Sequence, residues 1–208
     1  MFKFFKRKNK IDLHGWEKEL FSNIFKLLGN DYIGIEKQIS EGIIESVRID
    51  SKTPNYYSFR LNIPLLNKYE NKKEQLFNIN GIRIFDKFTQ SYKSITIDLG
   101  FGLILGYSIK DILNFNPDVN KIDISLVNKY YYENDDYKTI EFLFTKEELE
   151  LINISDVYKV ELNGNIYYHI KDLDDGDFIG IDIHKNIYKI THDPFEIIMQ
   201  NNELKHFL

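Results

Sequence analysis

Apolar residues recur at helical spacing near the start of the chain. They fall on one face at intervals of three and four residues, which predicts an amphipathic helix over residues 13–28. Asp12 can cap its start, and Gly29-Asn30 can end it. A second, shorter helical segment is expected over 32–39. The apolar positions of the first helix are Trp16, Leu20, Ile24, Leu27 and Leu28.

From residue 42 onward, alternation of apolar and polar residues replaces the helical spacing. It predicts strands over 42–49, 56–63, 77–85 and 94–109. Gly100, Gly102 and Gly106 interrupt the last of these, as at a bulge or bend. The first half of the chain is therefore expected to be a helix followed by an antiparallel meander.

The segment 114–120, which contains Pro117, is the strongest break in the pattern. We therefore expect two modules, residues 1–115 of unassigned role and residues 116–208.

The second module reads as two β-hairpins. One pairs 157–162 with 165–170 around Asn163-Gly164, a favoured two-residue turn, and the other pairs 177–183 with 187–191. Thr145 and Glu148 predict a capping box at the start of a short helix. Asp193 and Pro194 predict a closing C-terminal helix. The expected fold class is α+β.

Composition narrows the classes of protein. With 208 residues, 43% hydrophobic and 28% charged, the chain can form an ordinary globular core. It has no cysteine, which excludes disulfides, thiolate zinc sites and cysteine nucleophiles. A net charge of −5 argues against binding nucleic acid over the whole surface. There is no signal-peptide pattern and no apolar run long enough to cross a membrane, so we expect a cytoplasmic protein.

Histidine and aspartate are crowded together near the C-terminus, in residues 169–206. Such a cluster suits a divalent metal or acid-base chemistry, and a metal-dependent enzyme is therefore the alternative function. The spacing matches no metal-ligand or nucleophile motif, and the loop 172–177 does not fit a calcium-binding frame. We accordingly expect no catalytic residue, metal or cofactor. The histidines are His169, His184, His192 and His206.

Two acidic segments are the better candidates for a binding surface. Tyrosine is enriched at interface hot spots, and negative charge steers a basic partner toward the surface. The candidates are Tyr131, Tyr132, Glu133, Asp135 and Asp136 in the first segment, and Asp172, Asp174, Asp175 and Asp177 in the second.

The run Asp175-Gly176-Asp177-Phe178-Ile179-Gly180-Ile181-Asp182, followed by 187–193 ending in His192-Asp193, resembles the C-terminal half of the SUKH superfamily. The likeness covers 167–208. It implies a bacterial immunity protein that binds a cognate protein toxin, in many members a nuclease, and a helix after the His-Asp pair. The leading interpretation is thus a non-enzymatic binding protein. A structural or regulatory module with another partner is the third possibility.

Overall fold

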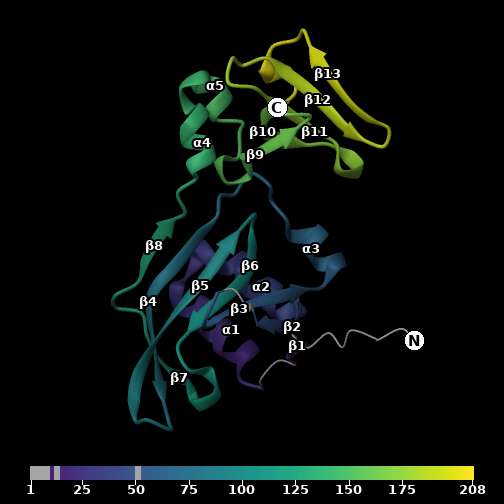
Figure 1. The fold of residues 1–208 in the computed structure, drawn as a ribbon. Helices are drawn as coiled ribbons and strands as arrows, with labels where there is room; N and C mark the ends of the chain where they lie inside the picture. The colour runs from purple at the N-terminus through teal and green to yellow at the C-terminus, as the bar shows by residue number, and fades with distance from the viewer. Residues whose placement is uncertain (1–9, 12–14, 50–52) are drawn as a thin grey trace, which may run out of the picture. The chain divides into compact units, whose positions relative to one another are not determined.

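The computed structural model describes residues 10–11, 15–49 and 53–208 (Figure 1). The chain forms two compact units. The first comprises Met1–Asn71 and Leu76–Tyr131, and the second comprises Lys72–Gln75 and Tyr132–Leu208.

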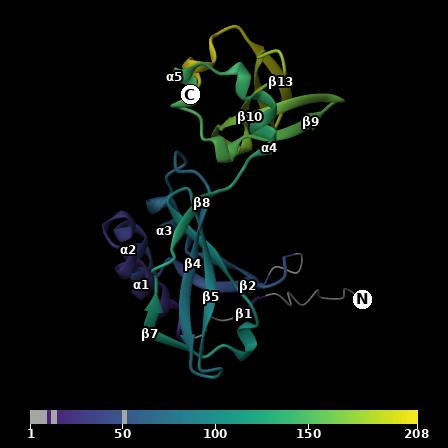
Figure 2. The ribbon, with the colours of Figure 1, turned by 90° about the vertical axis from the view of Figure 1, so that its left-hand side faces the viewer.

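Two helices cover one face of the sheet in the first unit (Figure 2). They are α1 (Glu17–Leu28) and α2 (Ile33–Glu41), joined by the 3₁₀ turn η1 (Asn30–Tyr32). The predicted N-terminal helix is confirmed, but it begins at Glu17, with Trp16 at its N-cap, and not at residue 13; Gly29 ends it with a φ of 89°. Its proposed cap, Asp12, lies outside the described residues.

The sheet of the first unit is antiparallel, with eight strands in the order β1-β2-β3-β6-β5-β4-β7 and with β8 also paired to β4. β8 pairs with Phe77–Asn80 of β4, and β7 pairs with its far end, at Arg83, Ile84 and Asp86. The strands are β1 (Lys10–Ile11), β2 (Ile44–Ile49), β3 (Tyr56–Leu61), β4 (Phe77–Asp86), β5 (Ser91–Gly100), β6 (Leu103–Ile109), β7 (Pro117–Asp123) and β8 (Asn128–Tyr131).

Two predicted strands of the first unit have different ends in the structure. The single strand expected over 94–109 is the hairpin β5-β6, because Phe101 and Gly102 form a turn with φ values of 52° and 73°. The strand expected to reach residue 63 ends at Leu61. There Asn62 accepts a hydrogen bond from the Leu65 N–H and caps α3 (Ile63–Tyr69). The 3₁₀ turn η2 (Ile112–Asn114) follows β6.

The first unit extends past the break predicted near residue 115. Strands β7 and β8 both follow that break and both pair with β4, so the unit runs to Tyr131. Pro117 is the first residue of β7, a position where a strand tolerates the missing N–H. The proline therefore marks the start of an edge strand and not a domain boundary.

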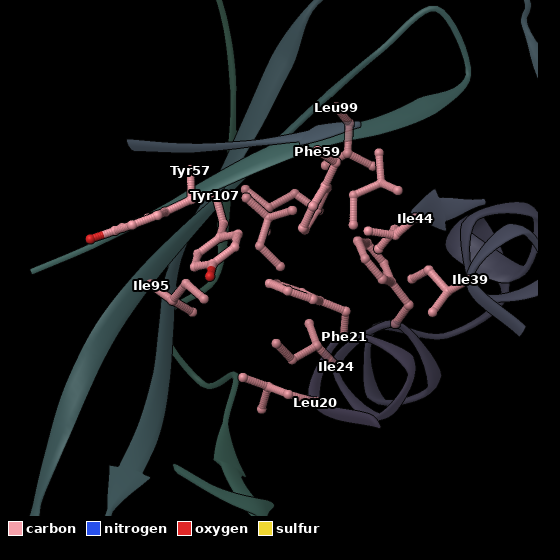
Figure 3. Packing of buried hydrophobic residues seen from close by; sticks show 14 of the residues in the cluster. Leu20, Phe21, Ile24, Ile39, Ile44, Tyr57, Phe59, Ile95, Leu99 and Tyr107 are labelled. Carbon is pink, nitrogen blue, oxygen red and sulfur yellow. The ribbon is translucent and has the colours of Figure 1, made fainter. Parts of the chain in front are cut away.

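The core of the first unit lies between α1, α2 and the sheet (Figure 3). Phe21 and Ile24 from α1 are fully buried, and Tyr107 from β6 is the largest of the fully buried side chains. The Phe21 ring lies 5.0 Å from the Tyr107 ring and 5.4 Å from the Phe59 ring, centroid to centroid. Leu27, predicted on the buried face of the helix, is 51% exposed.

The second unit carries a five-stranded antiparallel meander in the order β13-β12-β11-β10-β9. Its core joins the sheet to Ile140 of α4 and to Leu204 of η6. The predicted capping box of Thr145 and Glu148 and both predicted hairpins are confirmed. The elements are α4 (Asp135–Ile140), η3 (Glu141–Leu143), α5 (Lys146–Leu149), η4 (Ile154–Asp156), β9 (Tyr158–Leu162), β10 (Asn165–Asp172), η5 (Asp174–Gly176), β11 (Phe178–Ile181), β12 (Ile187–His192), β13 (Phe195–Gln200) and η6 (Leu204–His206).

The closing helix predicted after Asp193 is wrong. Asp193 and Pro194 form a turn in which the Thr191 hydroxyl donates to the Pro194 carbonyl at 2.6 Å. The chain then returns as β13 along β12, pairing His192 with Phe195 and Ile187 with Gln200. Phe, Ile and Met in Phe195–Gln200 suit a strand, and pairing satisfies the edge of β12 that a helix would leave open. The fold class is α+β, as predicted.

Within the described residues, no helix has the length and apolar character needed to cross a membrane.

Candidate functional site

The first predicted binding segment is divided between the two units. Tyr131 ends β8 in the first unit, where its ring lies 5.6 Å from the Phe77 ring and 4.6 Å from the Lys129 ammonium. Tyr132 begins the second unit and is 45% exposed. The two tyrosines are thus adjacent in sequence but belong to different packing environments.

The acids of that segment contact their own neighbours. Glu133 forms an ion pair with Lys138, which lowers the pKa of Glu133, and Asp135 lies 3.9 Å from the same ammonium. Asp136 accepts a hydrogen bond from the Lys159 N–H at 2.9 Å, so it joins α4 to β9. These carboxylates stabilise the local fold and offer a partner less free charge than the sequence suggests.

The second predicted segment contains two kinds of aspartate. Asp174 and Asp175 lie in η5, are exposed, and form no ion pair with any described residue. Asp177 instead contacts His192, accepting from its backbone N–H and lying 3.1 Å from its Nδ1. Burial alone would raise the pKa of Asp177, but the bonds from His192 outweigh it and lower that pKa.

The remaining aspartate of the segment, Asp172, belongs to a cluster around the buried His169. His169 of β10 is completely buried, and its Nε2 lies 3.0 Å from Asp172 Oδ1. Its Nδ1 lies 2.8 Å from the backbone oxygen of Asp156 in η4. The second carboxylate oxygen of Asp172 accepts from the Lys72 ammonium at 2.7 Å. One ligand atom from each of Asp156, His169 and Asp172 lies within 4.8 Å of the others.

A β-bulge brings His169 and Asp172 to the same face of β10. Residues three apart lie on opposite faces of a regular strand. The register between β10 and β11 shifts between His169 and Lys171, where two steps along β10 match one along β11. Because Ile170 is the extra residue in this bulge, the side chains of His169 and Asp172 lie on the same face of β10.

Aromatic rings fix the orientation of the histidine. The His169 ring stacks on Tyr158, with centroids 4.5 Å apart and planes inclined by 10°, and Phe178 lies 5.2 Å away on a neighbouring strand. Because a carbonyl oxygen only accepts, the short contact with Asp156 shows that Nδ1 carries a proton. Nε2 therefore faces the Asp172 carboxylate.

The two carboxylates of the cluster differ in their electrostatics. Burial raises the pKa of Asp156, and nearby Asp172 adds to this effect against His169 and Lys72, so the net shift is upward. Burial also opposes ionisation of Asp172, but the hydrogen bond and charge of Lys72, together with His169, lower its pKa. The pKa values of the two carboxyl groups are therefore shifted in opposite directions, upward for Asp156 and downward for Asp172.

The sequence predicted Asp172 as a partner-binding residue and did not indicate its contacts with His169 and Lys72 or the nearby Asp156. No spacing motif could show them, because η4, β10 and the short segment Lys72–Gln75 each supply one part of the cluster. The other three C-terminal histidines do not join it: His192 pairs with Asp177, while His184 lies in a turn and His206 in η6.

Negative charge is concentrated in the second unit. That unit contains 18 Asp and Glu residues against nine Lys, a net charge of −9, while the first unit carries +4. Several of these acids are exposed and form no ion pair among the described residues: Glu141, Glu150, Glu161, Asp174, Asp175, Asp193 and Glu196.

The first unit has a cavity of about 450 Å³ lined by Thr89, Lys93, Ser94, Lys110 and Asp111. Lys93 is already bound there to the buried Asp86, at 3.1 Å.

No family model, no curated protein and no solved structure matches this chain.

Proposed function

We propose that the protein is a non-enzymatic binding protein whose acidic second unit engages a basic protein partner, and that it acts as an immunity protein against a cognate toxin. The observation that carries the proposal is the net charge of −9 confined to that unit. A basic nuclease is the kind of toxin that such a surface would attract.

The mechanism requires binding alone. An acidic surface raises the rate at which a basic partner arrives in the correct orientation. An interface of about 1,600 Å² over a toxin's active site is enough for tight inhibition. Asp174 and Asp175 are exposed and have no ion-pair partner in the described part of the chain, so they are the residues of the predicted site best suited to this steering.

The resemblance to the SUKH superfamily supports the toxin as the partner, through the residues that form β11 and β12. The resemblance implied a helix after His192-Asp193, but the structure has strand β13 there. The likeness is therefore limited to the β11-β12 hairpin and its flanking loops. The proposal places the protein in the cytoplasm.

Co-expression tests the biological role directly. The chain is produced together with the product of the adjacent reading frame, and bacterial growth is measured. Rescue from a toxic neighbour, with a complex that survives purification, is the expected result. A neighbour that still kills when this chain is present would rule out immunity against it.

The contribution of the acidic loop is tested with the isolated complex. Asp174→Asn with Asp175→Asn should slow association by roughly threefold or more in about 20 mM salt and have little effect near 500 mM, because salt screens exposed charge. Asp31→Asn with Glu70→Gln removes the same charge from the exposed surface of the first unit and is the matched control. An association rate equally insensitive to both double variants would remove η5 from the interface.

A further inference from the structure

The cluster of Asp156, His169 and Asp172 leaves one interaction that needs a cation. Nδ1 of His169 donates to a backbone carbonyl, so a neutral ring turns the lone pair of Nε2 toward the Asp172 carboxylate. Two acceptors 3.0 Å apart repel each other. A positive species, either a proton or a metal ion, therefore has to lie at this position.

Lys72 does not fill that position. Its ammonium binds Oδ2 of Asp172, whereas His169 faces Oδ1 of the same carboxylate. A cation bound through Oδ1 therefore leaves the ion pair with Lys72 intact. The Asp156 carboxylate lies within the same 4.8 Å group and accepts no hydrogen bond from the described residues.

We propose that Asp156, His169 and Asp172 form a binding site for one divalent transition-metal ion of the zinc type, held by His169 Nε2 and one carboxylate oxygen from each aspartate. Imidazole nitrogen combined with carboxylate oxygen suits such ions, whereas calcium requires six to eight oxygen ligands. The Asp172 side chain is 44% exposed, so water can complete the coordination.

The contacts of His169 are those expected of a histidine that binds a metal ion. A metal-binding histidine characteristically donates its second ring nitrogen to a carbonyl or carboxylate, which fixes its tautomer and orientation. The Asp156 backbone oxygen accepts that bond here, and Tyr158 and Phe178 hold the ring. Bound metal would join η4 to the bulge of β10.

Metal titration of the full chain tests the site. Protein dialysed against EDTA and then against metal-free buffer is titrated with ZnCl₂ by calorimetry, and bound zinc is counted by elemental analysis after gel filtration. We expect one zinc ion per chain, with much weaker binding of CaCl₂. Asp172→Asn should weaken zinc binding by about 10-fold or more, because loss even of a hydrogen-bond partner of a metal ligand costs about 10- to 100-fold. Asp156→Asn should act in the same direction.

Two control variants separate a built site from general attraction of cations. Asp174→Asn removes an equal charge two residues away and should leave the affinity within about twofold. Lys72→Gln removes the ion pair of Asp172 but no proposed ligand, so it should retain zinc. The proposal is overturned if the wild-type chain binds no zinc, if calcium binds equally well, or if Asp174→Asn weakens binding as much as Asp172→Asn does. Because Asp172 is exposed, its variant remains informative even if Asp156→Asn fails to fold.

Discussion

The hydroxyl of Tyr107 is hydrogen-bonded to a buried carboxyl group in the core of the first unit. Tyr107 and Glu17 are both completely buried, and the hydroxyl donates to Glu17 Oε1. Burial and the neighbouring carboxylate both raise the pKa of Tyr107, so it remains a donor at every ordinary pH. Removing a donor from a buried carboxylate costs about 1–3 kcal/mol.

Tyr107→Phe should therefore lower the free energy of unfolding by about 2 kcal/mol, measured by urea denaturation. Tyr57→Phe is the matched control. Its ring stacks on Tyr107 at 5.2 Å, but its hydroxyl forms no hydrogen bond among the described residues. A loss below about 0.5 kcal/mol is expected for the control. Equal effects of the two variants would show that the Glu17 contact contributes nothing.

Asp86 makes the stability of the first unit sensitive to acid. It is completely buried, and it accepts hydrogen bonds from the N–H groups of Phe88 and Asn116 and from the Thr89 hydroxyl, while Lys93 lies 3.1 Å away. Burial alone would raise the pKa of Asp86. The bonds from Asn116, Thr89, Phe88 and Lys93 outweigh burial and hold that pKa far below its ordinary value.

A carboxylate with a lowered pKa in the folded state stabilises the fold above its unfolded pKa of about 3.9, and this contribution is lost as the pH falls toward the folded pKa. Asp86→Asn should therefore destabilise the protein by about 2–3 kcal/mol at pH 7. The difference from wild type should shrink below about pH 4. Urea unfolding of the wild type and of Asp86→Asn at pH 7, 5 and 3 measures this difference in the free energy of unfolding. A difference that is constant across this range would contradict the lowered pKa of Asp86.

At the scale of elements, local signals in the sequence were sufficient for most of the fold. Gly29, the capping box of Thr145 and Glu148, and the turn at Asn163-Gly164 all lie where the sequence placed them. Predictions failed where pairing decides the outcome. A proline after an aspartate suits a helix start equally well as a turn, and only the open edge of β12 selects β13.

The bulge in β4 is another feature that depends on pairing. Gly81 has a φ of 78° and lies where the register with β5 shifts between Ile79 and Ile82. A Cβ at this position would overlap the backbone carbonyl oxygen of Leu126, in the loop between β7 and β8. The glycine thus allows two strands to pair with one edge of β4.

Gly81→Ala should lower the free energy of unfolding by about 2 kcal/mol or more, because it adds both a positive-φ penalty and a backbone overlap. Gly34→Ala is the contrasting control, since Gly34 lies in α2 and a Cβ added there would meet open space. Alanine favours a helix over glycine by up to about 1 kcal/mol, so this variant should match or exceed the wild type. Thermal unfolding of both variants compares their stabilities with that of the wild type. A Gly81→Ala protein as stable as the wild type would contradict this prediction.

At the scale of the whole molecule, part of the candidate site could be predicted from the sequence and part could not. The acidic loop was visible as a run of aspartates, and two of them, Asp174 and Asp175, are exposed and form no ion pair with any described residue. The cluster around His169 was hidden because a one-residue bulge and a distant segment containing Lys72 assemble it. The bulge depends on strand-pairing register and the position of Lys72 depends on tertiary contact, and no local sequence pattern encodes either.

The unequal division of charge predicts an unequal response to salt. The second unit has a net charge of −9 and repels itself, whereas the first carries +4. Screening should therefore stabilise the second unit more. Hydrogen–deuterium exchange in about 20 mM and about 500 mM NaCl measures the local stability of each unit separately. Peptides from β5-β6 report on the first unit and peptides from β10-β11 on the second. We expect the slowing of exchange by salt to be clearly larger in β10-β11. An equal response in both sheets would mean that the carboxylates of the second unit are already neutralised locally, as Glu133 is by Lys138, and would weaken the case for steering a basic partner.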